Sequence, residues 1–146
     1  YTRTYTLSLH DALPIFRSLR FLVLWPHKSG IEDCILDADW YADTLHFSAR
    51  DENNVVVACC TVVAELKVIE NCTCAYRLRA MATHPAIRGA GVGKALLEFA
   101  MSHYLNQHFW CDARQVAVPF YEKCGWQVYS SVYEIPQIGP HFLMMK

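Results

Sequence analysis

The sequence predicts one mixed domain of the α/β (α+β) class, in which an antiparallel meander is followed by a β-α-β-α-β-β succession. A chain of 146 residues has the size of a single domain. Strand-like runs bounded by turn residues fill the middle of the chain, and helical periodicity begins only after them. This combination of elements excludes a β-sandwich and a helical bundle.

The first half supplies the strands. Residues 21–25 form a short apolar run that stops at Pro26, which predicts a strand, and residues 26–44 read as a long irregular connection. Three strand-like runs follow, joined by polar turns at 51–54 and 70–71; they are 45–50, 55–65 and 73–82.

The second half adds two helices. One apolar stripe with helical spacing begins at Val92 and continues through Leu96, Phe99, Ala100 and His103. A brief strand at 109–111 and a helix at 116–124 come next, and Gly125 suits the end of that helix. Residues 126–132 and 142–145 are expected to close the sheet.

The amino-acid composition excludes several classes of function. Thirteen basic against 14 acidic residues argue against a partner bound through phosphates, so no nucleic acid is expected. No apolar run approaches about 18 residues, so no membrane span is expected. The closely spaced cysteines among the seven are Cys59-Cys60 and Cys72-x-Cys74, and neither pair has the C-x-x-C spacing of a zinc site. The odd number of cysteines favours a reducing cytoplasm. A compact enzyme or small-molecule binder remains.

The first 16 residues do not resemble the rest. The chain opens at Tyr1, and residues 5–15 resemble a translated sequencing adapter. We therefore expect residues 1–16 to be a non-native leader and residues 17–146 to be the single domain, with a short helix at 8–13 as the alternative for the leader.

A glycine loop lies between the third meander strand and the first long helix. Glycines at 89, 91 and 93 leave the backbone bare, and the amides at a helix start attract phosphate. The segment therefore predicts a pyrophosphate site. Position 88 is Arg and position 95 is Ala, so a Walker A loop is excluded, and Lys94 stands where a dinucleotide loop needs its third glycine. An oxidoreductase is disfavoured for the same reason, and a loop without a ligand is the remaining alternative.

Two motifs then resemble one family. Arg88-x-x-Gly91-x-Gly93 resembles the Q/R-x-x-G-x-G/A signature of the GNAT superfamily of N-acetyltransferases, and residues 119–126 are similar to its F-Y-x-x-x-G-F segment, with Trp126 in place of Phe. The resemblance covers roughly residues 20–146 and implies a GNAT-like acyl-CoA N-acyltransferase fold. The family usually has two helices between its first and second strands, in a region that shapes the acceptor pocket, whereas residues 26–44 look shorter and irregular.

The resemblance also implies acetyl-CoA as cosubstrate and a direct attack, in a ternary complex, by a primary amine of a small molecule or peptide. Tyr121 would be the general acid, since a phenol stays protonated at pH 7; the alternative is a core aromatic. The pantetheine arm would pair with the strand ending at 81–83, where the amide near Met81 could hold the oxyanion. The residues expected to bind the coenzyme are Met81, Ala82, Thr83, Arg88, Gly89, Ala90, Gly91, Val92, Gly93 and Lys94.

The acceptor side is less defined. Strand alternation places Arg77 and Arg79 on one face, where they are expected to bind an acceptor carrying a carboxylate or phosphate. An ion pair with Glu65, or a bulge that turns one arginine away, is the alternative. Glu65, His84 and Asp112 are candidate bases without a diagnostic arrangement. A non-catalytic acyl-CoA-binding or regulatory domain of the same fold is the alternative function, no metal is expected, and a homodimer is left open.

Overall fold

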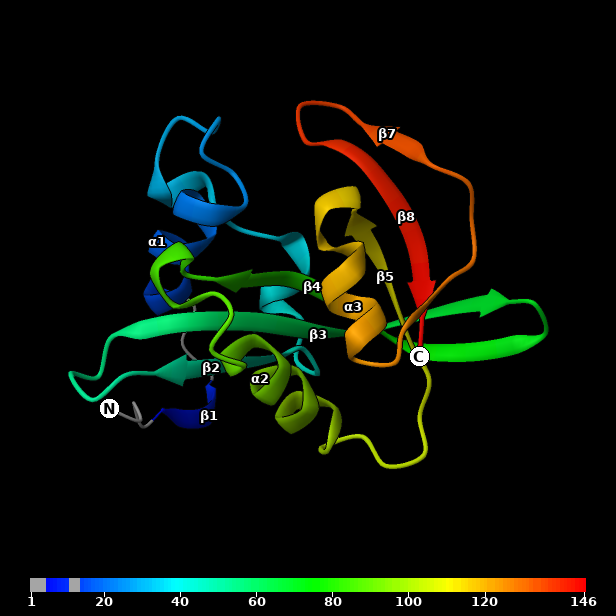
Figure 1. Ribbon diagram of the computed structural model, residues 1–146, viewed down its shortest axis with the longest axis horizontal. Coiled ribbons are helices and arrows are strands. Elements are labelled where there is room, and N and C mark those ends of the chain that lie inside the picture. Colours follow the sequence, from blue (N-terminus) through cyan, green and yellow to red (C-terminus); the bar gives the residue numbers. More distant parts are fainter. Residues whose placement is uncertain (1–4, 11–13) are drawn as a thin grey trace. The chain divides into compact units, whose positions relative to one another are not determined.

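The computed structural model describes residues 5–10 and 14–146, apart from the side chains of Leu9, His10 and Pro14. The chain forms two compact units, each assembled from two stretches. Unit 1 contains the described residues up to Val62 and Ala80–Leu105, and unit 2 contains Val63–Arg79 and Asn106–Lys146. Two long strands, β3 (Val56–Ile69) and β4 (Cys72–Thr83), run through both units (Figure 1).

Unit 1 carries the sheet order β1-β2-β3-β4. Its strands β1 (Thr6–His10) and β2 (Leu45–Arg50) pair antiparallel, and β2 pairs antiparallel with β3. The helices are α1 (Pro14–Val23), α2 (Val92–Met101) and three short 3₁₀ turns, η1 (Ile31–Asp33), η2 (Asp37–Trp40) and η3 (Pro85–Ile87).

Unit 2 carries the order β3-β4-β5-β8-β6, with β7 paired to β8. Its elements are β5 (Phe109–Arg114), η4 (Gln115–Ala117), α3 (Val118–Lys123), β6 (Gln127–Val128), β7 (Tyr133–Ile135) and β8 (Gly139–Met145). The β4–β5 pair is parallel and has two rungs, Tyr76 with Phe109 and Arg77 with Trp110. The mixed sheet predicted from the sequence is confirmed.

Helices cover the two faces of the unit 1 sheet. Phe16 and Leu19 of α1 pack on Cys59 and Ala82 in one buried cluster. On the other face, Phe99 of α2 meets Phe47 of β2 edge-on at 6.0 Å. Both contacts agree with the geometry of the elements, because strand residues alternate faces and helical residues three or four apart share one.

A charged pair lies within the unit 1 core. The side chains of Arg20 (α1) and Asp39 (η2) are 0% exposed and join through two hydrogen bonds of 2.7 and 3.0 Å. Arg20 also donates to the Cys34 carbonyl and the Thr61 hydroxyl, and Asp39 accepts from the Leu36 amide. These bonds fix the 26–44 connection against the sheet, because breaking any of them would leave a charge or an amide buried without its partner.

The prediction of a strand at 21–25 is wrong, because these residues belong to α1 or follow it. Pro14 stands at the start of the helix, where its missing N–H costs nothing, and Phe16, Leu19 and Val23 repeat with helical spacing. The helical spacing cannot be recognised when the first 16 residues are set aside, because Pro14 and Phe16 are then left out. The irregular 26–44 connection is confirmed, although it contains η1 and η2.

The structure also differs from the predicted element boundaries elsewhere in the chain. Residues 6–10 form β1, so the alternative of a helix at 8–13 is wrong at 8–10, while 11–13 lie outside the described residues. The expected strand at 126–132 shortens to β6, and β7 was not predicted. The turns at 51–54 and 70–71 are confirmed; Glu70 and Asn71 both have positive φ, as a tight hairpin turn requires. Within the described residues, none of the helices is sufficiently long and apolar to traverse a bilayer.

Candidate functional site

The glycine loop of unit 1 connects β4 to α2 through η3. Gly89 and Gly91 have φ of +84° and +81°, a left-handed conformation that residues with a Cβ adopt only with strain. A Cβ added at either position would meet nothing within 4 Å. The glycines are therefore required by the backbone and not by crowding, and the space beside them is open to a ligand.

The loop ends at the N-terminus of α2. Gly91 is the N-cap and offers no side chain, and the first intrahelical bond runs from the Ala95 amide to the Gly91 carbonyl at 3.0 Å. The amides of Val92, Gly93 and Lys94 thus precede any intrahelical acceptor. A bare, positively polarised helix start of this kind suits a phosphate group.

Two cations flank this helix start. The Arg88 Nε donates to the Thr83 carbonyl at 3.3 Å, which closes the loop onto the end of β4. Lys94 lies 3.9 Å from Glu98 one turn on, with both side chains more than half exposed. Exposed pairs of this type hold their partners weakly, so the Lys94 ammonium can turn to an incoming anion.

Unit 1 also contains the end of β4, with Met81, Ala82 and Thr83. Just before them Ala80 has φ +50°, an uncommon value for a residue with a Cβ. The regular alternation of β4 is therefore interrupted after Arg79, where the sequence analysis had named a bulge as one alternative. The structure thus brings all ten residues expected to bind the coenzyme into unit 1.

Tyr121 of α3 belongs to unit 2 and is 7% exposed. Gly125, at φ +86°, ends the helix, and the Trp126 amide returns to the Tyr121 carbonyl at 3.0 Å. The Tyr121 and Trp126 rings lie 5.5 Å apart, which is the hydrophobic contact that accompanies this type of helix end. The F-Y-x-x-x-G-W pattern therefore specifies a local structure that holds the Tyr121 ring in place.

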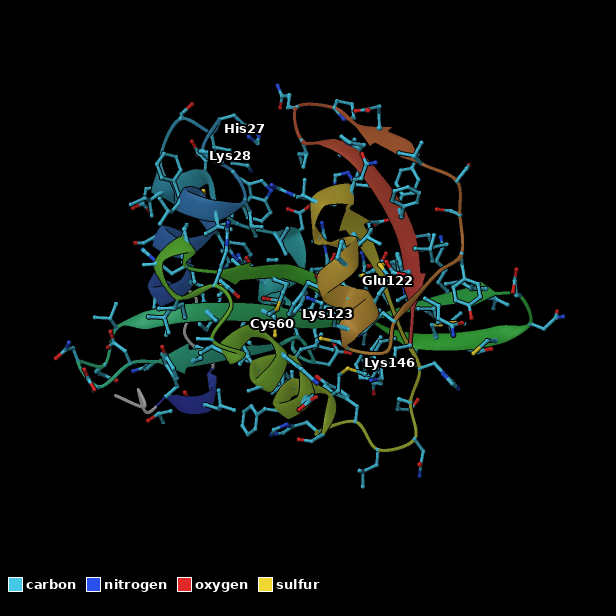
Figure 2. The ribbon with its side chains drawn as sticks, viewed as in Figure 1. His27, Lys28, Cys60, Glu122, Lys123 and Lys146 are labelled. Atoms are coloured by element: carbon cyan, nitrogen blue, oxygen red, sulfur yellow. The ribbon has the colours of Figure 1, made fainter. Side chains whose placement is uncertain are left out.

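Lys146 supports the same helix end. Its Nζ donates to the Cys124 carbonyl at 2.5 Å, and a Cβ at Gly125 would approach that Nζ to 3.0 Å. Figure 2 shows Lys146 below α3, near Glu122 and Lys123. A cation at the carbonyl end of a helix is favourable, so this contact further fixes α3.

Arg77 of β4 is bonded to two carboxylates in unit 2. It donates to both Glu65 oxygens at 3.2 and 3.3 Å and to Asp112 at 2.5 Å, and it lies over the Trp110 ring at 4.6 Å. The ion pair with Glu65 was the alternative weighed from the sequence. Because two anions already neutralise Arg77, an acidic acceptor would meet little free charge there. Arg79 is partly buried in the same unit.

The sequence analysis missed three residues of unit 2. Tyr133 donates to Asp112, and burial, followed by that bond, raises the pKa of its hydroxyl. His141 stacks on the Tyr133 ring at 6.2 Å. Arg114 lies opposite His141 across the β5–β8 pair, and burial lowers the pKa of its guanidinium. No motif or spacing marks these positions, because the sheet register alone brings them together.

The three candidate bases already take part in hydrogen bonds within the protein. His84 caps η3 by accepting the Ala86 amide at Nδ1. Glu65 is bonded to Arg77, and Asp112 accepts from both Arg77 and Tyr133. Within the described ranges, no three His, Cys, Asp or Glu side chains gather as metal ligands would.

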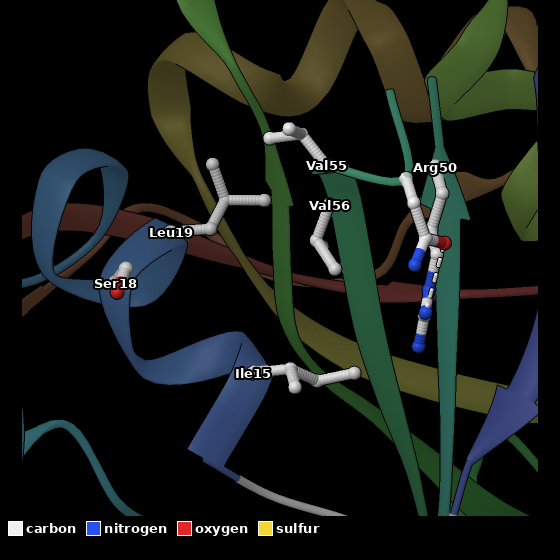
Figure 3. Close-up of a pocket in the computed structure, with 7 residues that line it drawn as sticks. Ile15, Ser18, Leu19, Arg50, Val55 and Val56 are labelled. Atoms are coloured by element: carbon white, nitrogen blue, oxygen red, sulfur yellow. Dashed lines mark hydrogen bonds between the residues drawn. The ribbon is translucent and has the colours of Figure 1, made fainter. Parts of the chain in front are cut away.

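A separate open pocket of about 420 Å³ lies beside α1 in unit 1 (Figure 3). Its lining contains none of the residues expected to bind coenzyme or acceptor, and consists of Ile15, Ser18, Leu19, Arg50, Asn54, Val55 and Val56. Arg50 is bonded to Asn54 on its rim. We assign this pocket no part in the site.

Comparison with known proteins shows the family. The model of the acetyltransferase (GNAT) domain matches residues 42–128. The chain is 32% identical, over 97% of its length and 93% of the relative's, to the uncharacterized N-acetyltransferase YitI of Bacillus subtilis (strain 168). Its fold is similar to that of Escherichia coli ElaA, with a TM-score of 0.74, 21% identity and 99% of each chain covered. It is also similar to an aminoglycoside 6'-N-acetyltransferase complexed with coenzyme A, with a TM-score of 0.70, 14% identity, and 97% and 96% of the two chains covered.

Proposed function

The chain belongs to the GNAT acetyltransferase family, and we propose that it transfers an acetyl group from acetyl-CoA to a primary amine of a small molecule or peptide. The supporting observation is the loop at the start of α2, where Gly89 and Gly91 adopt left-handed φ with open space beside them. This geometry suits the coenzyme pyrophosphate, with the amides of residues 89–94 as donors, apart from that of Ala90, which donates to the Ile87 carbonyl. Arg88 and Lys94 would be the counter-charges.

The pantetheine arm would extend along the strand end at Met81, Ala82 and Thr83. An extended amide chain can bond to a strand edge as a peptide does. An amide near Met81 would then stabilise the negative charge that develops on the thioester oxygen when the amine attacks.

Tyr121 would serve as the general acid. The amine nitrogen forms its bond to the acetyl carbon, the C–S bond breaks, and the phenol gives its proton to the departing sulfur. Support comes from the fixed ring, held by the Gly125 helix end and the Trp126 contact. Tyr121→Phe keeps the ring packing and removes only the hydroxyl.

Arg79 is proposed to bind a carboxylate or phosphate on the acceptor. Arg77 already has two carboxylate partners and would contribute less to the binding of that group. To test this, kcat/KM for acidic and uncharged amines is compared in wild type and Arg79→Ala. An unchanged ratio excludes Arg79 as the charge-reading residue.

Calorimetric titration with acetyl-CoA, followed by detection of released coenzyme thiol with a panel of amines, tests the function itself. We expect binding and amine-dependent thiol release, with turnover of Tyr121→Phe lower by about 10²–10⁴-fold at nearly unchanged coenzyme affinity. Tight binding without thiol release for any amine would instead identify a non-catalytic acyl-CoA-binding domain. Turnover of Tyr121→Phe within twofold of wild type would return Tyr121 to a packing role.

A further inference from the structure

His141 of β8 stands in a row of polar side chains across the unit 2 sheet. It is opposite Arg114 of β5 on one side and opposite Tyr133 of β7 on the other. Residues directly opposite in antiparallel strands share a face, so these three side chains lie together. Asp112 is on the same face, since it alternates with Arg114 along β5 and accepts from Tyr133.

The hydrogen bonds of His141 define its tautomer. Its Nδ1 lies 2.7 Å from the Gly139 carbonyl. A carbonyl can only accept, so Nδ1 carries a hydrogen, and in the neutral form of an imidazole protonated there the lone pair is at Nε2. In the part of the chain that the structure describes, the hydrogen bond of the His141 ring is the one at Nδ1, and Nε2 is not among the fully buried polar atoms that lack a partner. His141 is 4% exposed as a residue, and Nε2 is the ring nitrogen that can accept a further proton.

The other histidines near the sheet do not offer this arrangement. The Nδ1 of His46 is hydrogen-bonded to the Thr61 hydroxyl at 2.9 Å, and its Nε2 is buried. The Nδ1 of His84 is likewise occupied, by the Ala86 amide. His103 has the same Nδ1 bond as His141, to the Phe99 carbonyl, but it lies at the end of α2 in unit 1.

Arg114 connects His141 with the proposed acid. It is opposite His141 in the sheet, and its guanidinium is within electrostatic reach of the Tyr121 hydroxyl, which raises the arginine pKa against the larger lowering by burial. Tyr121 and His141 therefore flank one arginine within unit 2. The charged and titratable groups facing His141 from neighbouring strands are Arg114, Asp112 and Tyr133.

We propose that His141 is the general base of the reaction, accepting at Nε2 the proton that the acceptor amine loses. This rests on the proposed function. As the N–C bond forms, the amine proton passes to Nε2; as the C–S bond breaks, Tyr121 protonates the sulfur. The products are the acetamide and the free thiol, and transfer of one proton from His141 to Tyr121 through solvent restores both side chains.

The experiment compares His141→Gln and His141→Phe with wild type, using amines whose own pKa values range from about 5 to 10. Phe keeps a ring on Tyr133, and Gln keeps a hydrogen-bonding group. His103→Gln is the matched control, because it removes a histidine with the same Nδ1 bond outside unit 2. We expect kcat/KM for strongly basic amines to fall by about 10²–10⁴-fold in both His141 variants. For weakly basic amines, which lose their proton readily without help, the deficit should shrink to a few-fold.

An equal deficit for every amine would show that His141 acts only through structure and would overturn the proposal, as would a deficit no larger than that of His103→Gln. If neither variant folds, carbethoxylation of the wild type replaces them. Activity should then decline in step with modification of the peptide containing His141, and loss of activity with His141 unmodified would refute the proposal. A wild type that acetylates no amine would instead refute the proposed function, and this inference with it.

Discussion

Replacing Asp39 by alanine removes the carboxylate that neutralises the Arg20 guanidinium in the core of unit 1. Both side chains are 0% exposed, so water cannot take the place of the lost partner. Arg20 would keep its bonds to Thr61 and the Cys34 carbonyl but lose the two to Asp39. The Leu36 amide would lose its acceptor as well.

The size of the effect follows from these contacts. Removing one partner of a buried ion pair costs about 3–5 kcal/mol, and an unsatisfied buried amide adds about 1 kcal/mol or more. A domain of this length loses about 2–4 °C in Tm for each kcal/mol. The Tm of Asp39→Ala should therefore be lower than that of wild type by about 8–24 °C.

Thermal and urea unfolding followed by circular dichroism measure this. The matched control is Glu32→Ala, which breaks the pair between Arg17 and Glu32, in which Glu32 is 85% exposed. Exposed pairs contribute about 0–1 kcal/mol, so this Tm should change by less than about 4 °C. If the two alanine variants unfold at the same temperature, our account of the Arg20–Asp39 pair is wrong. Arg20→Met combined with Asp39→Leu should recover most of the loss, since apolar replacement of both partners removes the unpaired charge.

Three further predictions concern the backbone and the thiols. In Gly91→Val, left-handed strain should lower stability by about 1–2 kcal/mol while coenzyme affinity falls at least about tenfold by calorimetry; an unchanged affinity in the folded variant would exclude the phosphate loop. At Ala80, φ +50°, Gly should keep or raise the urea midpoint, whereas Val should lower the free energy of unfolding by about 1–3 kcal/mol and the midpoint with it; equal midpoints would contradict the strain. Burial raises the pKa of Cys59 to about 12 and of Cys74 to about 11, from an ordinary value of 9.0. The unfolded thiols ionise first, so stability present in full below pH 9 should decline as pH rises toward 11–12; a flat urea midpoint between pH 8 and 10.5 would refute this.

The elements that the sequence predicted well are those whose signal is local. The alternation at 45–50 and the paired turn residues Glu70 and Asn71 depend on neighbours in the chain, as does the Gly91 start of α2. The missed helix α1 has an equally local signal. It was lost because its first turn, with Pro14 and Phe16, fell in a segment set aside as foreign.

The polar residues of the candidate site divide in the same way. The glycine loop and Tyr121 lie in contiguous motifs, so the sequence points to them as candidates. His141, Tyr133 and Arg114 come from three strands and meet only through the register of β5, β8 and β7. The partners of Arg77 could be foreseen for Glu65 but not for Asp112, which is 35 residues away in the chain. Long-range pairing of this kind leaves no periodic trace in a single sequence.

The two-rung ladder between β4 and β5 has a consequence for the behaviour of the protein in concentrated solution. Within unit 2, β4 and β5 share no further rung beyond Arg77 and Trp110, although β5 stays paired with β8 as far as Arg114. The side of β5 turned from β8 is therefore a strand edge within the sheet, and such edges recruit strands of other chains. An acyl-CoA whose amide arm paired with this edge would cover it and prevent such pairing. We therefore expect the free protein to self-associate more readily than the coenzyme-saturated protein, so that storage with coenzyme slows its loss from solution.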